Sequence, residues 1–118
     1  MRTMIALALA CAASGALADD VEDAHRQAIR GRDSYWNCLA REYSPEHVKS
    51  MSIEDFTADI AAACRSERQN FRVSLIDYLS IQHPDAETGS HLSTANRAIE
   101  FAQKDIVTAF TRRKGAAN

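Results

Sequence analysis

The clearest hydrophobic pattern lies between Ser52 and Leu79, where apolar residues recur every three or four positions. This spacing is typical of one face of an α-helix, which turns once in about 3.6 residues. Ser52 and Asp55 stand three apart, as in a capping box with Asp in the place of Glu or Gln. We predict one long central helix, and a break near Asn70 would divide it into two. Its apolar stripe is Ile53, Phe56, Ile60, Cys64, Phe71, Leu75 and Tyr78.

Helical spacing recurs on both sides of this segment. Residues 21–43 follow acidic residues that favour a helix N-terminus, and residues 92–110 lead into three cations and Gly115, which favour a C-terminus. The connector, residues 83–90, contains Pro84, which ends the central helix. No segment shows the sustained alternation of a β-strand. The predicted fold class is all-α, a three-helix bundle, or a four-helix bundle if the central helix breaks.

Two positions inside this pattern carry local information. Gly31 costs about 1 kcal/mol relative to Ala in a helix interior, so we expect a bend or the close approach of a neighbouring element there. Ser44 and Pro45 fit an N-cap and a first helical position, which indicates that a short helix follows them.

The start of the chain has the composition of a secretory signal peptide. Arg2 precedes an uncharged apolar run at residues 4–13, which is too short to span a bilayer. Ala16 and Ala18 form an A-x-A pattern, so we expect cleavage after Ala18. Residues 1–18 would then be the signal, and residues 19–118 a single helical-bundle domain in the periplasm or outside the cell.

A lipoprotein is the alternative interpretation of this segment. Small residues precede Cys11, which would carry the lipid, although Ala8 occupies the position where such signals usually have Leu. No other uncharged stretch is long enough for a membrane helix, so we expect no membrane span in the mature chain.

Charge narrows the class of partner. Without Arg2 the chain carries thirteen Lys and Arg against sixteen Asp and Glu, a net charge of −3. This near balance argues against a general nucleic-acid-binding protein, which would concentrate a basic excess on one face.

Cys38 and Cys64 remain as an even pair in an exported protein, which predicts one disulfide. Neither cysteine belongs to a C-x-x-C motif or has a His close in sequence, which argues against a redox role.

The predicted disulfide constrains how the first two helices meet. If a plain hairpin joined them, Cys38 would lie about 9 Å and Cys64 about 18 Å from the turn, at about 1.5 Å per residue. This mismatch exceeds the Cα separation of about 7 Å that a disulfide tolerates. An extra helical turn would lengthen the first arm. We therefore predict that residues 45–50 are helical, that the chain reverses near Met51 and that Trp36 packs close to the bridge.

The connector and the residue that follows it provide four potential metal ligands. His83, Asp85, Glu87 and His91 would bring two imidazoles and two carboxylates to one cation, but their spacing matches no recognised site. Residues 22–25 form one Glu-x-x-His motif, whereas a di-iron bundle needs two such motifs and two further glutamates. The competing interpretation is a set of solvated polar positions, and we predict no cofactor.

Arg65, Arg68 and Arg72 follow the i, i+3, i+7 spacing that places side chains on one helix face. Ten of the thirteen mature cations are Arg, whose planar guanidinium binds carboxylates and phosphates through two parallel hydrogen bonds. We treat the three residues as a candidate face for a protein partner or an anion. The competing interpretation is a solvated face balanced by neighbours such as Glu67.

Motifs for catalysis or nucleotide binding are absent from the sequence. It contains no G-x-S-x-G, G-x-x-x-x-G-K-[ST], G-x-G-x-x-G, H-E-x-x-H or C-x-x-C-H. We therefore predict no catalytic residue and expect a small exported interaction module of the inhibitor, immunity or accessory type. Alternatives are a metal-binding protein and an enzyme whose carboxylates come from distant positions.

A second function is suggested by a resemblance. Trp36-Asn37-Cys38, and Ala63-Cys64 followed by charged residues and Phe71, resemble the small acid-stress chaperones of the bacterial periplasm. Those chaperones are exported, all-helical and closed by one disulfide, although the cysteine spacing is much shorter here. The resemblance would imply dissociation in acid and binding of client proteins through an exposed bundle core.

Overall fold

A computed structural model describes residues 9–117, which form five α-helices and no β-strand. The helices are α1 (Leu9–Glu42), α2 (Pro45–Ser50), α3 (Ile53–Ala62), α4 (Arg65–Gln82) and α5 (Thr88–Ala117). The predicted all-α class is therefore confirmed. Within the described residues, no helix combines the length and the apolar content needed to cross a membrane.

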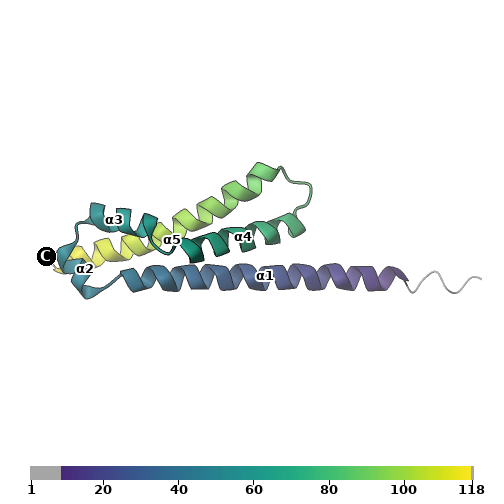
Figure 1. Ribbon diagram of the computed structural model, residues 1–118, viewed down its shortest axis with the longest axis horizontal. Coiled ribbons are helices and arrows are strands. Elements are labelled where there is room, and N and C mark those ends of the chain that lie inside the picture. Colours follow the sequence, from purple (N-terminus) through teal and green to yellow (C-terminus); the bar gives the residue numbers. More distant parts are fainter. Residues whose placement is uncertain (1–8, 118) are drawn as a thin grey trace, which may run out of the picture.

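The helices form three antiparallel arms (Figure 1). The first arm is α1, the second is α3 followed by α4, and the third is α5, while α2 lies at the end of the bundle where the chain first reverses. The expected number of three or four helices is thus too small. The difference arises because the second arm is broken and because α2 is a separate helix.

The break in the second arm lies at Ala63 and Cys64, not near Asn70. Ala63 is extended, with a ψ of 156°, and Cys64 is left-handed, with φ 59° and ψ 45°. As a result α3 packs mainly against α5, whereas α4 packs against both α1 and α5. The apolar stripe continues in phase across the break, which is why the pattern alone indicated one helix.

The short helix α2 has the start that the sequence predicted. Ser44 is its N-cap, and the Ser44 hydroxyl accepts a hydrogen bond from the His47 backbone N–H at 3.2 Å. Pro45 occupies the first helical position. The prediction that residues 45–50 are helical is confirmed, and after Met51 the chain returns along the bundle (Figure 1).

The core is built around aromatic rings. Phe56 of α3 stacks on Phe110 of α5, with ring centroids 3.8 Å apart, and Tyr43 packs edge-on against both. Two residues of the predicted stripes lie at the surface instead, because Ile53 and Leu92 are 37% and 46% exposed. The main core cluster comprises Tyr35, Leu39, Val48, Phe56, Ile60, Phe71, Ile99, Ala102, Ile106 and Phe110.

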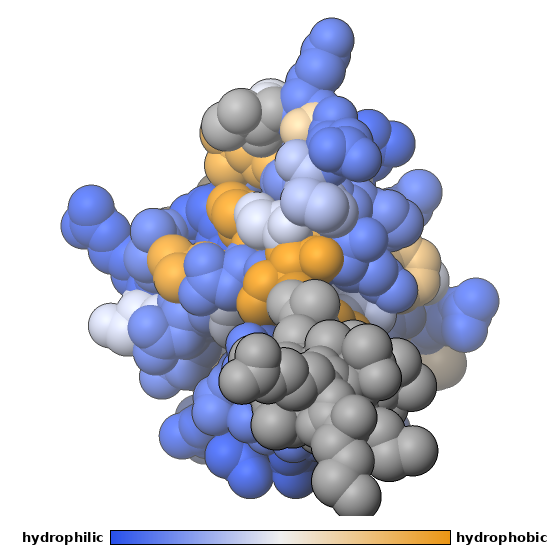
Figure 2. All heavy atoms as spheres, turned by 90° about the vertical axis from the view of Figure 1, so that its right-hand side faces the viewer, coloured by the Kyte–Doolittle hydropathy of each residue, from blue (hydrophilic) through white to orange (hydrophobic). Residues whose placement is uncertain are grey.

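At the end of the bundle away from α2, the chain passes from α4 to α5 (Figure 1). Seen from that side, the described surface is predominantly hydrophilic, with a smaller apolar area near the middle of the view (Figure 2). Residues 1–8 of the expected signal peptide lie outside the described residues, and residues 9–18 belong to α1. Cleavage after Ala18 and lipidation of Cys11 remain predictions.

Candidate functional site

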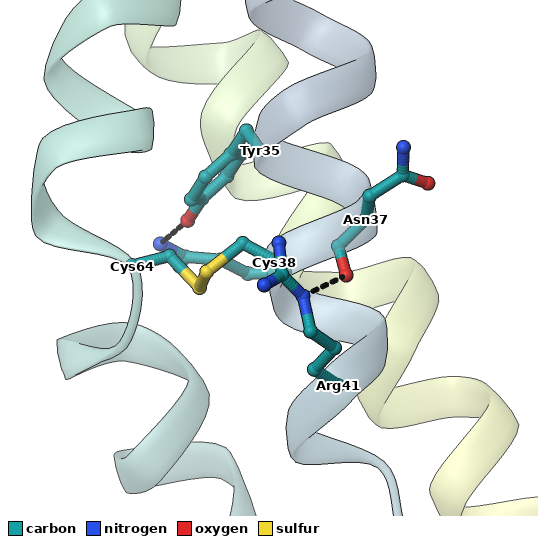
Figure 3. The surroundings of a disulfide bond; sticks show 6 residues. Tyr35, Asn37, Cys38, Arg41 and Cys64 are labelled. Atoms are coloured by element: carbon teal, nitrogen blue, oxygen red, sulfur yellow. Dashed lines mark hydrogen bonds between the residues drawn. A yellow bond between two sulfur atoms is a disulfide. The ribbon is translucent and has the colours of Figure 1, made fainter.

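The disulfide joins α1 to the junction between α3 and α4 (Figure 3). Cys38 and Cys64 are bonded with a Cα–Cα distance of 6.0 Å, which confirms the predicted pairing. Because Cys64 immediately precedes Arg65, the bond also fixes where α4 begins relative to α1. The disulfide therefore determines where Arg65, the first of the three candidate arginines, lies relative to α1.

Trp36 was expected to pack close to the disulfide, but its side chain packs elsewhere. Its ring packs edge-on against Phe101 of α5, and its Nε1 donates a hydrogen bond to Asp105 at 3.3 Å. Residues two apart on a helix point in nearly opposite directions, so Trp36 faces α5 when Cys38 faces the α3–α4 junction. The aromatic residue drawn beside the bridge is Tyr35 (Figure 3).

The three predicted arginines line an open groove of about 630 Å³ between α4 and α5. Arg65, Arg68 and Arg72 come from α4 and lie along this groove, whereas their role as an interaction face stays a prediction. We call this feature the arginine groove. Its other lining residues are Gln69 of α4 and Asn96, Ile99, Glu100 and Gln103 of α5.

Hydrogen bonds orient two of the guanidinium groups. Arg72 Nε donates to Asn96 Oδ1 at 3.0 Å, and Arg72 Nη1 donates to Gln69 Oε1. Arg68 Nη1 donates to the Ala61 carbonyl at the end of α3. A guanidinium has five N–H donors, so each group keeps donors that these contacts do not use.

The arginine groove carries a positive charge that no ion pair among residues 9–117 neutralises. In the described part of the chain, ion pairs within 4.0 Å join Arg26 to Asp23 and Arg32 to Asp33, and neither involves the groove. Glu67, the neighbour expected to balance these arginines, forms no ion pair with them there. The lining therefore presents three guanidinium groups and one carboxylate, that of Glu100.

A second groove, between α1 and α4, provides a contrast. Its volume is about 500 Å³, and its charged lining residues are Arg30 and Asp77, so their charges cancel. The arginine groove is therefore the more strongly charged of these two grooves.

The proposed metal ligands of the connector are not gathered into a cluster. His91 is largely buried, and its Nε2 lies 3.2 Å from the His83 carbonyl oxygen, an arrangement that links the connector to α5. Among the described residues, three ligand atoms come within 4.8 Å of one another only at Cys38, Cys64 and Glu67. Both sulfurs there belong to the disulfide, so neither is a thiolate that would bind a metal.

Sequence reasoning missed the half of the groove that α5 supplies. Asn96 and Gln103 are seven residues apart, which places them on one face beside the apolar stripe. Asn96 orients Arg72, and Gln103 Nε2 donates to the buried Tyr35 hydroxyl at 3.0 Å. Their spacing was visible, but the sequence does not say which helix faces them.

Comparison with protein-family models, with curated proteins and with solved structures gives no match to this chain. The functional argument therefore rests on the geometry of the arginine groove. Its lining consists of guanidinium, amide, aliphatic and carboxylate side chains, without Ser, Cys, His, Lys or Tyr. Such a set donates hydrogen bonds to an anionic group but does not pair a nucleophile with a general base.

Proposed function

We propose that this protein is a small exported interaction module of the inhibitor, immunity or accessory type, and that it binds a protein partner through the arginine groove. The observation that carries the proposal is the set of three guanidinium groups around one open groove, none of which forms an ion pair with another described residue. Arginine is enriched at protein interfaces, where its planar group makes both polar and stacking contacts.

A protein partner fits the charge of the chain better than a nucleic acid does. The mature chain carries a net charge of −3, so the positive groove belongs to an otherwise slightly acidic molecule. Nucleic-acid binding relies on many phosphate contacts spread over a basic surface, whereas this groove offers three cations. A local cationic site on an acidic protein is better suited to a partner that has a few carboxylates in one place.

The experiment is a capture from the extracytoplasmic compartment with the tagged, exported protein at neutral and at acidic pH. We expect one partner at a fixed stoichiometry, and we expect its loss when Arg65, Arg68 and Arg72 are all replaced by Gln. The matched control replaces three exposed arginines outside the groove, Arg41, Arg112 and Arg113, and changes the net charge equally. This control should retain the partner.

Two outcomes would contradict the proposal. Equal loss in both triple variants would show that net charge, not the groove, determines binding. Capture of many proteins at acidic pH alone, without a stoichiometric partner at neutral pH, would instead support the chaperone alternative.

A further inference from the structure

We infer that the arginine groove receives an acidic α-helical segment of the partner, with carboxylates at positions i, i+4 and i+7 of that segment. The inference rests on the proposed function and names the chemistry of the partner at the same groove. It is drawn from the spacing of the arginines, from the way their side chains are held and from the position of Glu100.

The spacing of the arginines matches a helix. Arg65 and Arg72 are seven residues apart on α4, about 10.5 Å along the helix axis at about 1.5 Å per residue. Acidic residues at i, i+4 and i+7 of a second helix span the same length on one face. In an extended strand the same length covers about three residues, and neighbouring side chains alternate between faces. A helix running beside α4 therefore pairs its carboxylates with the three guanidinium groups more readily than a strand does.

Two of the three arginine side chains are held by contacts within the protein before a ligand binds. Arg72 uses two of its donors on Asn96 and Gln69, and Arg68 uses one on the Ala61 carbonyl. These contacts are made within the protein itself, so less rotamer entropy is lost when a carboxylate binds the remaining donors. The buried Ile99 side chain forms part of the lining between the two helices.

Glu100 sets the orientation of the ligand. It lies on the α5 side of the groove, opposite the arginines of α4. An acidic side chain that faces Glu100 would be repelled, whereas a neutral or basic one would be tolerated. The favoured helix therefore has carboxylates toward α4 and a neutral or basic residue toward α5. A segment with carboxylates on all faces would be repelled by Glu100 and would bind less tightly.

The test uses lactam-stapled helical peptides of about 15 residues, since isolated peptides of this length are only marginally helical. One peptide carries Glu at i, i+4 and i+7 on one face, and a second of identical composition carries them at i, i+2 and i+5. A single-stranded oligonucleotide and inorganic polyphosphate are the two phosphate probes. Binding to the full mature protein is measured by calorimetry and fluorescence anisotropy at low and at physiological salt.

The peptide with its glutamates on one face should bind roughly tenfold tighter than the second peptide, as expected for a few exposed ion pairs. Replacing Arg65, Arg68 and Arg72 by Gln should remove that difference, whereas replacing Arg41, Arg112 and Arg113 should preserve it. Replacing Glu100 by Gln should improve the binding of a uniformly acidic helix. Circular dichroism of every variant verifies that the bundle is still folded.

Equal affinity for the two peptides, or tighter binding of the phosphate probes, would contradict the inference that the groove binds an acidic helix. If the groove variant still loses the captured partner in that case, the proposed function stands and only this inference fails. If the first peptide binds as expected but no stoichiometric partner is captured, the ligand chemistry stands and the proposed function fails.

Discussion

Gly31 of α1 and Phe71 of α4 bring the two helix backbones into close contact. A Cβ atom on Gly31 would lie 3.0 Å from the Phe71 Cα and 2.7 Å from the Ser74 Oγ. Of the bend or close approach expected at this glycine, the structure shows the close approach. The absence of a side chain at Gly31 allows α4 to lie deep against α1 beside the core.

Replacing Gly31 by Ala should destabilise the protein by about 1–3 kcal/mol, because the two backbones must separate to admit the methyl group. This cost outweighs the gain of about 1 kcal/mol in helix propensity that Ala normally brings. Urea unfolding followed by circular dichroism gives the free energy of unfolding. Gly115→Ala is the matched control, since a Cβ there meets nothing within 4 Å. Equal stability of the two variants would contradict the close packing.

Phe56 is expected to be one of the most costly residues to truncate. It is fully buried and stacks on Phe110, so Phe56→Ala should lower the free energy of unfolding by about 3–5 kcal/mol. Ile53 lies three residues earlier on the same helix and is 37% exposed, so Ile53→Ala should cost less than about 1 kcal/mol. Thermal and urea unfolding of both variants would test this difference. Similar costs would mean that α3 presents another face to the core.

Lys114 connects the end of α5 to α2. Its Nζ donates hydrogen bonds to the Val48 carbonyl at 3.0 Å and to the Met51 carbonyl at 2.6 Å. Both carbonyls lie at the C-terminal end of α2, where a cation also interacts favourably with the helix dipole. Lys114→Met should therefore cost about 1–2 kcal/mol, measured by urea unfolding. Lys104→Met, at an exposed position of α5, should have almost no effect, and equal costs would contradict this capping role.

Reduction of the disulfide should lower the melting temperature by more than about 10 °C and leave the helical circular dichroism signal largely intact at low temperature. The Cys38–Cys64 bond spans 26 residues, which corresponds to about 3–4 kcal/mol of chain entropy in the unfolded state. The apolar stripes that form the helices are unaffected by reduction. Mass spectrometry of the native protein, purified without reductant, should show no free thiol at either cysteine, and detection of two would contradict the bridge.

The sequence was sufficient for features that depend on local pattern. Helical periodicity predicted the three arms, and the Ser44-Pro45 pair predicted α2. Cysteine number predicted the Cys38–Cys64 bond, and the i, i+3, i+7 spacing predicted the shared face of the three arginines. Each of these follows from residues that are close in sequence or from a simple count.

The features that the sequence did not reveal depend on which helices pack against each other. Leu92 fits a spacing of three to four residues along α5 but is 46% exposed, because the buried face of α5 passes through His91 and Ala95 instead. Asn96 became part of the candidate site only because α5 lies beside α4. The turn at Cys64 had no local signal either, since neither Gly nor Pro occurs between Ala61 and Arg65.

Cys64 is the described non-glycine residue with a positive φ, and this conformation costs about 1–2 kcal/mol for a residue with a Cβ. Two features can stabilise this left-handed conformation of Cys64. One is the bond to Cys38, and the other is the separate packing of α3 on α5 and of α4 on α1. A pair of variants without the bond separates them: Cys38→Ala with Cys64→Gly, and Cys38→Ala with Cys64→Ala.

If packing alone keeps the turn, the variant with Gly at position 64 should be more stable by about 1 kcal/mol, because Gly adopts the left-handed conformation without strain. If α3 and α4 merge into one helix without the bond, the order reverses, because Ala favours a helix interior by about the same amount. Ala58→Gly, at an exposed position inside α3, calibrates the helical cost of Gly in this protein. Because the core residues Phe56, Ile60 and Phe71 pack on different partners on the two sides of Cys64, we expect the Gly variant to be the more stable one when urea unfolding is measured. A more stable Ala variant would show that the disulfide, and not the packing, holds the turn in place.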